Sequence, residues 1–193
     1  MTGMNRLYLA SQSPRRLELM RQIGLAPEVL PVAVDESALP NEPVESFVRR
    51  LAVEKARAGF DRLTDKKVWV VGGDTVVSVD GQVLGKPRDQ ADYRRMLALL
   101  SGRTHQVLTA VAVVHDGVVQ ATVSISQVTF AELDASEIDA YWRSGEPRDK
   151  AGGYGIQGYA GKWVRHLQGS YSGIMGLPLY ELDQLLKESG YYG

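Results

Sequence analysis

Apolar residues along this chain follow two spacings, one typical of helices and one typical of strands. Helical spacing begins after Pro14 and recurs in four later stretches. Start and stop signals flank several of them, such as Asp134 before one stretch and Gly24 after the first. We expect helices at residues 14–23, 43–60, 89–100, 134–142 and 178–187.

Short runs of apolar and β-branched residues predict strands between these helices. Asp-Gly pairs at residues 80–81 and 116–117 are typical of tight hairpin turns. The stretch 145–161 is rich in glycine and charge, so we expect a loop or a loose turn there. Strands are expected at residues 7–9, 28–34, 68–71, 76–79, 82–84, 104–114, 118–130 and 162–167.

The alternation of strands and helices predicts the α/β class. Because two long antiparallel ribbons lie between helices, we expect a mixed twisted sheet flanked by helices. A length of 193 residues fits a single domain, residues 1–193, with two lobes around a central cleft where a ligand would bind.

Composition excludes several classes of partner and several kinds of functional site. A net charge of −1 provides no overall field that would attract nucleic acid or an acidic membrane. The absence of cysteine excludes disulfides, thiolate metal sites and a cysteine nucleophile. No apolar run has the length of a signal peptide or a membrane span. We therefore expect a cytoplasmic protein with no membrane or nucleic-acid partner.

The first strand leads into a cluster of groups suited to phosphate. Ser11 and Ser13 precede Pro14, which favours a helix start, and Arg15 and Arg16 follow in the first turn. Helix N-termini attract anions, and hydroxyl and guanidinium groups add donors for phosphate oxygens. This segment predicts a phosphate-binding site.

Other polar residues permit two interpretations each. Asp74 follows an apolar strand and two glycines, so it is either a metal ligand or general base, or an aspartate that caps a turn. Lys86 stands between glycine and proline, Lys55 lies on an expected helix, and Glu36 lies in an acidic loop. Each of these three could equally be a solvated surface residue.

The segment 149–158 contains five glycines or alanines and one glutamine, Gln157. Small residues let a flat ligand approach the backbone, and an amide both donates and accepts at a base edge. A flexible loop is the alternative. No Walker A or His-Glu-x-x-His pattern is present. The candidate site residues are therefore mainly cationic side chains and carboxylates, a combination suited to Mg²⁺-phosphate chemistry.

Five motifs in this order resemble the signatures of the Maf family and span nearly the whole chain. They are SQSPRR at residues 11–16, GDTV at 73–76, GKP at 85–87, DKAGGYGIQG at 149–158 and GLPL at 176–179. The resemblance implies an α/β fold related to inosine triphosphate pyrophosphatases. It also implies hydrolysis of nucleoside triphosphates between the α- and β-phosphates, with a divalent cation, Mg²⁺ or Mn²⁺, as cofactor.

The resemblance also implies roles for individual residues. Asp74 would accept a proton from the attacking water, and Glu36 and Asp74 would hold the metal. Base selection would fall to Arg15, Thr75 and Gln157. The triphosphate would be bound by Ser11, Ser13, Arg16, Lys55 and Lys86.

Arginine, threonine and glutamine at the three base-selecting positions resemble the members that prefer dTTP and UTP. The resemblance implies a house-cleaning hydrolase of these two nucleotides, with modified pyrimidine nucleotides as further candidate substrates. Two alternatives stay open: a non-catalytic nucleotide-binding regulator linked to cell division, and a pyrophosphatase for non-standard purine nucleotides. The sequence leaves the preferred metal and a homodimeric state undecided.

Overall fold

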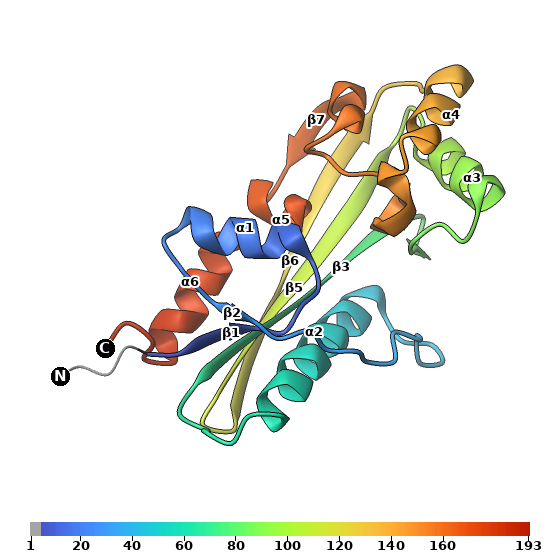
Figure 1. Cartoon of the computed structure of the whole chain (residues 1–193). Helices are drawn as coiled ribbons and strands as arrows, with labels where there is room; N and C mark the ends of the chain where they lie inside the picture. The colour runs from blue at the N-terminus through green and yellow to red at the C-terminus, as the bar shows by residue number, and fades with distance from the viewer. Residues whose placement is uncertain (1–4) are drawn as a thin grey trace. The chain divides into compact units, whose positions relative to one another are not determined.

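The computed structural model describes residues 5–193 (Figure 1). Within these residues, seven strands form one mixed sheet in the order β2-β1-β3-β5-β6-β7, and β4 pairs with β3. β1 runs parallel to both of its neighbours, whereas β4 and β7 are antiparallel to theirs. The strands are β1 (Leu7–Leu9), β2 (Glu28–Val29), β3 (Trp69–Val79), β4 (Gln82–Leu84), β5 (Thr104–His115), β6 (Val118–Phe130) and β7 (Val164–Gln168).

The five expected helices are present, close to their expected bounds, and side-chain caps explain where three of them begin. Ser13, Asp89 and Asp134 each accept a backbone N–H of the first helical turn through the side chain. The helices are α1 (Pro14–Gln22), α2 (Val44–Asp61), α3 (Gln90–Leu100), α4 (Ala135–Arg143), α5 (Tyr171–Met175) and α6 (Leu179–Glu188). The mixed sheet flanked by helices is therefore confirmed.

Two expectations about local structure are wrong. Residues 68–71 and 76–79 belong to one continuous strand, β3, which passes through Gly72 and Gly73. The expected strand at 28–34 ends at Val29, two residues before Pro31, which has no N–H for a further ladder bond. The stretch 145–161, expected to be a loop or a loose turn, contains short 3₁₀ turns, η1 (Glu146–Asp149), η2 (Ala151–Gly153) and the start of η3 (Tyr159–Trp163). The short helix α5 was not predicted.

The chain divides into two compact units. Unit 1 comprises the described residues up to Asp74, together with Thr109–Ser124 and Gly176–Gly193. It contains α1, α2, α6, β1, β2 and the first part of β3. Figure 1 shows α2 on one side of these strands and α1 and α6 on the other. Such two-sided cover explains why the start of β3 is apolar on both faces.

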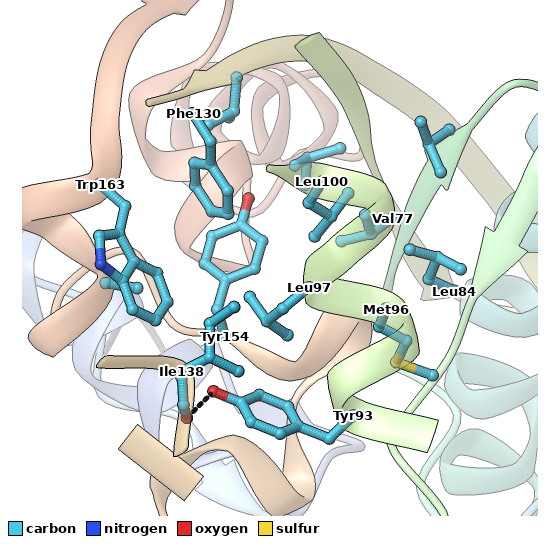
Figure 2. Packing of buried hydrophobic residues seen from close by; sticks show 14 of the residues in the cluster. Val77, Leu84, Tyr93, Met96, Leu97, Leu100, Phe130, Ile138, Tyr154 and Trp163 are labelled. Atoms are coloured by element: carbon cyan, nitrogen blue, oxygen red, sulfur yellow. Dashed lines mark hydrogen bonds between the residues drawn. The ribbon is translucent and has the colours of Figure 1, made fainter. Parts of the chain in front are cut away.

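Unit 2 comprises Thr75–Leu108 and Ile125–Met175. Its core gathers the apolar face of α3 with aromatic residues from β6, α4 and the 3₁₀ turns (Figure 2). Tyr93 is fully buried and donates its hydroxyl to the carbonyl oxygen of Ile138 at 2.8 Å. Within residues 5–193, no helix is both long and apolar enough to cross a bilayer.

Candidate active site

Asp74 lies inside β3 and is only 7% exposed. The two glycines before it let the strand pass very close to α2. A Cβ atom at residue 72 would lie 2.5 Å from the carbonyl oxygen of Ala52 and 2.6 Å from the amide nitrogen of Ala56. Glycine is therefore required at residue 72 for this approach. The interpretation of Asp74 as a turn aspartate is wrong, because the strand continues through it.

The close packing of β3 on α2 brings Asp74 to Lys55. The Lys55 ammonium nitrogen lies 2.8 Å from Oδ1 of Asp74 and 2.8 Å from Oε1 of Glu36. Only 14% of the Lys55 side chain is exposed, so this lysine is not a solvated surface residue. One lysine thus joins a buried carboxylate on a strand to a half-exposed carboxylate in the loop before α2.

Burial and charge act on Asp74 in opposite directions. Burial raises the pKa of Asp74, and the positive charges of Lys55 and Arg16 partly oppose this rise. The second carboxylate oxygen, Oδ2, is buried and accepts no hydrogen bond from the residues that the structure describes. Such a group is unusual in a folded protein and is typical of an atom that meets a ligand.

The start of α1 supplies hydroxyl and guanidinium groups. Ser13 caps the helix by accepting the Arg16 N–H at 3.4 Å. Ser11 Oγ accepts the Ser13 N–H at 3.1 Å and lies 3.5 Å from Nη1 of Arg16. The two serines and the guanidinium therefore form one connected cluster at the positive end of the helix.

Arg16 reaches from this cluster toward β3. Its Nε donates to the carbonyl oxygen of Gly176 at 2.8 Å, and a Cβ atom at residue 73 would lie 3.0 Å from the same nitrogen. Burial lowers the pKa of Arg16, and the charge of Asp74 opposes the change. Arginine remains protonated in proteins, so it brings a positive charge beside the Asp74 carboxylate.

Six of the predicted site residues therefore gather in unit 1. Ser11, Ser13 and Arg16 form one cluster, Glu36, Lys55 and Asp74 form another, and the charge interaction between Arg16 and Asp74 links the two. Arg15, a seventh, is half-buried beside Arg16 on α1, and its charge adds to the lowering of the Arg16 pKa.

Three predicted residues belong to unit 2. Thr75 follows Asp74 directly on β3, and both Lys86 and Gln157 are exposed in connecting segments. The segment of Lys86 is tied to the glycine-rich segment, because the Gly152 N–H donates to the carbonyl oxygen of Gly85 at 3.1 Å. The assigned roles of these three residues remain predictions.

Tyr141 organises the glycine-rich segment, although sequence analysis did not single it out. Its buried hydroxyl accepts the Gly155 N–H at 3.1 Å and lies 2.9 Å from Oε1 of Glu146. A tyrosine on the apolar face of α4 resembles any other core residue in the sequence. The signal that would have distinguished it, its contact with the Gly155 N–H, exists only in three dimensions.

Within residues 5–193, no cluster of three or more His, Asp or Glu side chains is arranged to hold a metal ion. Glu36 and Asp74 nevertheless share one cation, the Lys55 ammonium, and Asp74 has an unpartnered oxygen. Mg²⁺ is commonly bound by one or two carboxylates together with water and substrate phosphates. This donor set therefore fits a divalent cation that arrives with a phosphate ligand.

The model of the family described as "Maf-like protein" matches residues 6–189. The chain belongs to the Maf family. A relative named "dTTP/UTP pyrophosphatase" from Hydrogenovibrio crunogenus is 51% identical and aligns over 97% of both chains. A relative of the same name from Pseudoalteromonas atlantica is 50% identical, over 93% of this chain and 95% of that one.

A solved structure supports the fold of this Maf protein. The HAM1 protein from Coxiella burnetii aligns with a TM-score of 0.53, over 96% of this chain and all of that chain. At 17% identity this likeness concerns the fold alone. It agrees with the expected α/β fold.

Proposed function

We propose that this Maf protein hydrolyses dTTP and UTP between the α- and β-phosphates and releases a nucleoside monophosphate and pyrophosphate. The observation that carries the proposal is the buried Asp74 carboxylate, in which one oxygen contacts Lys55 and the other has no partner among residues 5–193. Relatives about half identical over nearly the whole chain are named for this activity, which supports the same substrates here.

The proposal includes a divalent cation, Mg²⁺ or Mn²⁺, held by Asp74 and Glu36. When bound, such an ion neutralises charge on the phosphate oxygens and polarises the phosphorus. Lys55 already contacts both carboxylates at 2.8 Å, so the two groups lie close enough to share a ligand. The remaining ligands would be phosphate oxygens and water.

The residues of unit 1 suggest how the reaction would be promoted. Asp74 orients the attacking water and takes a proton on Oδ2, the oxygen that Lys55 does not contact. Arg16 and Lys55 offset the negative charge that develops on the α-phosphate and the leaving pyrophosphate. Ser11 and Ser13 act as acceptors in their local contacts, so each can direct its hydroxyl hydrogen to a phosphate oxygen.

Further roles in the proposal rest on the family resemblance. Lys86 would bind the triphosphate, while Arg15, Thr75 and Gln157 would select the base. A glutamine amide both donates and accepts, which matches the donor and acceptor edge of uracil or thymine. The exposed position of Gln157 leaves its amide accessible to such a ligand.

A panel of nucleoside triphosphates tests the proposal. The protein is incubated with each common or non-standard nucleotide plus Mg²⁺ or Mn²⁺, and pyrophosphate is measured. We expect dTTP and UTP to be hydrolysed fastest. Faster release from inosine or xanthosine triphosphate would favour the purine alternative. Nucleotide binding without any pyrophosphate release would favour the regulator.

A further inference from the structure

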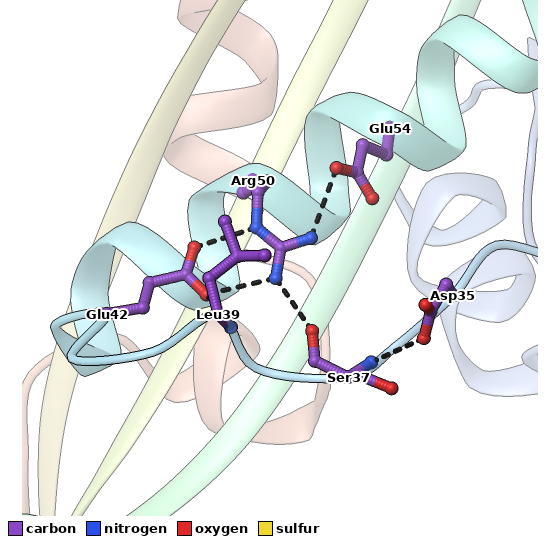
Figure 3. A network of polar contacts seen from close by, with 6 residues as sticks. All are labelled: Asp35, Ser37, Leu39, Glu42, Arg50 and Glu54. Atoms are coloured by element: carbon purple, nitrogen blue, oxygen red, sulfur yellow. Dashed lines mark hydrogen bonds and ion pairs between the residues drawn. The ribbon is translucent and has the colours of Figure 1, made fainter.

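The loop between β2 and α2 carries Glu36 but contains no helix or strand over residues 30–43. Its shape therefore depends on side-chain contacts. Asp35 accepts the Ser37 N–H at 2.9 Å, and Glu42 accepts the Leu39 N–H at 3.0 Å (Figure 3). These bonds order the loop internally, but they do not attach it to the rest of unit 1.

Arg62 attaches the start of the loop, because it donates to the carbonyl oxygen of Pro31 at 2.5 Å. Arg50 on α2 attaches the part of the loop that follows Glu36. Its Nε and Nη2 lie 2.7 Å and 3.0 Å from the two carboxylate oxygens of Glu42, a bidentate pair. The same Nη2 donates to the carbonyl oxygen of Ser37 at 2.9 Å, and Nη1 lies 3.1 Å from Oε1 of Glu54 (Figure 3). One guanidinium thus connects two points of the loop to the helix.

The pair between Arg50 and Glu42 is shielded from water, because 23% and 8% of the two side chains are exposed. The hydrogen bond from Arg50 lowers the pKa of Glu42, so the carboxylate stays ionised near neutral pH. A planar guanidinium with several fixed donors holds its partners in one geometry, which a lysine cannot reproduce. This contact is therefore a fixed connection and not a transient surface pair.

Glu36 itself has little packing to fix it, since 52% of its side chain is exposed. Arg50 holds the carbonyl of the next residue, Ser37, while Lys55 on the same helix contacts the Glu36 carboxylate. α2 therefore holds the backbone of Ser37 and the side chain of Glu36 at the same time. If a cation or a phosphate draws Lys55 away, Arg50 still keeps Glu36 in place.

We infer that Arg50 is a positioning residue that places Glu36 for binding of the divalent cation. The inference rests on the proposed function, in which Glu36 is a metal ligand. Arg50 makes no contact with the metal or the substrate in this account. Arg50 acts only by holding the loop that carries Glu36. Removal of Arg50 should therefore weaken metal binding only in proteins that keep the Glu36 carboxylate.

The test measures Mn²⁺ binding to the whole protein by electron paramagnetic resonance, with a dTTP analogue whose α–β bridge is a methylene. We expect Arg50→Ala to weaken Mn²⁺ binding about tenfold, the scale found when groups that orient metal ligands are removed. Arg50→Lys should recover only part of this loss. Arg49→Ala, at the exposed neighbouring arginine on α2, is the matched control and should stay within about twofold of the wild type.

The same measurement in a Glu36→Gln background separates positioning from general damage. In the Glu36→Gln background, Arg50→Ala should cause no further loss of Mn²⁺ binding. An equal loss in both backgrounds, or no loss in either, would overturn the role of Arg50. Should Glu36→Gln bind Mn²⁺ as the wild type does, the metal role of Glu36 in the proposed function fails, and this inference fails with it. Thermal melting confirms that each variant is folded.

Discussion

Replacement of Asp74 by asparagine keeps the shape of the side chain and removes its charge. The amide oxygen can still accept from Lys55, which lies 2.8 Å from Oδ1. The amide nitrogen then takes the place of Oδ2, the oxygen proposed to receive the proton. Asp74→Asn therefore removes the base while leaving the surroundings of residue 74 largely unchanged.

General bases contribute about 10²- to 10⁴-fold to the rate of an enzyme reaction. At 1.36 kcal/mol for each factor of ten, this corresponds to about 3–5 kcal/mol in the activation free energy. We expect kcat to fall by that factor. Without a divalent cation, binding of the methylene analogue should be retained or tightened, because a negative charge beside the triphosphate has been removed.

Two opposite effects on stability should nearly cancel in Asp74→Asn. Burial disfavours the ionised carboxylate, as its raised pKa shows, so removing the charge stabilises the fold at neutral pH. Oδ2 has no hydrogen-bond partner among the described residues, and an amide N–H left unpaired at that position costs about 1–3 kcal/mol. We therefore expect only a small change in the free energy of unfolding.

The assay follows pyrophosphate release from dTTP at saturating Mg²⁺, together with thermal melting of the same samples. Asp61→Asn, at an exposed aspartate that ends α2, is the matched control and should keep wild-type turnover. Turnover of Asp74→Asn within about threefold of the wild type, with a normal melting curve, would refute the role of Asp74 as the base.

Gly72→Ala should destabilise the protein by about 3 kcal/mol, because a Cβ atom there would lie 2.5 Å from a backbone atom of α2. At Gly85 a Cβ atom would meet no described atom within 4 Å, so Gly85→Ala should change the unfolding midpoint in urea very little. Equal midpoints for the two variants would contradict this. Burial lowers the pKa of His105 to about 4, so the unfolded chain binds a proton that the folded protein does not, and stability should fall as pH drops from 6.5 toward 4. At 1.36 kcal/mol for each pH unit, the loss in the free energy of unfolding is at most about 3 kcal/mol. His105→Gln should therefore flatten the dependence of Tm on pH. Parallel curves of Tm against pH for the variant and the wild type would contradict this. Gln157→Glu should lower kcat/KM for UTP relative to inosine triphosphate, and an unchanged ratio would exclude a role of this amide in base selection.

Local signals were sufficient to predict most helices. Ser13 and Pro14 mark the start of α1, and Asp134 marks the start of α4, because caps act on backbone groups of the same turn. The course of β3 through Gly72 and Gly73 was not predictable in this way. Glycine usually weakens a strand, and the reason for it here is contact with a helix almost twenty residues earlier in the sequence.

The same distinction between local and long-range contacts applies to the candidate site. The cluster of Ser11, Ser13 and Arg16 is local, so the residues that form it stand together in the sequence. The contact of Lys55 with Asp74 and Glu36 joins a helix, a strand and a loop. The family resemblance pointed to these three residues but did not predict their contact. Arg50 escaped notice because an arginine on a charged helix is usually solvated, and its partner Ser37 lies thirteen residues away.

The central claim is hydrolysis of a pyrimidine nucleoside triphosphate between the α- and β-phosphates. ³¹P nuclear magnetic resonance of a reaction with dTTP and Mg²⁺ tests it most directly, because pyrophosphate, orthophosphate, dTMP and dTDP give separate signals. The account predicts dTMP and pyrophosphate in equal amounts from the first time point, with both absent for Asp74→Asn over the same period. Initial formation of dTDP and orthophosphate would contradict it.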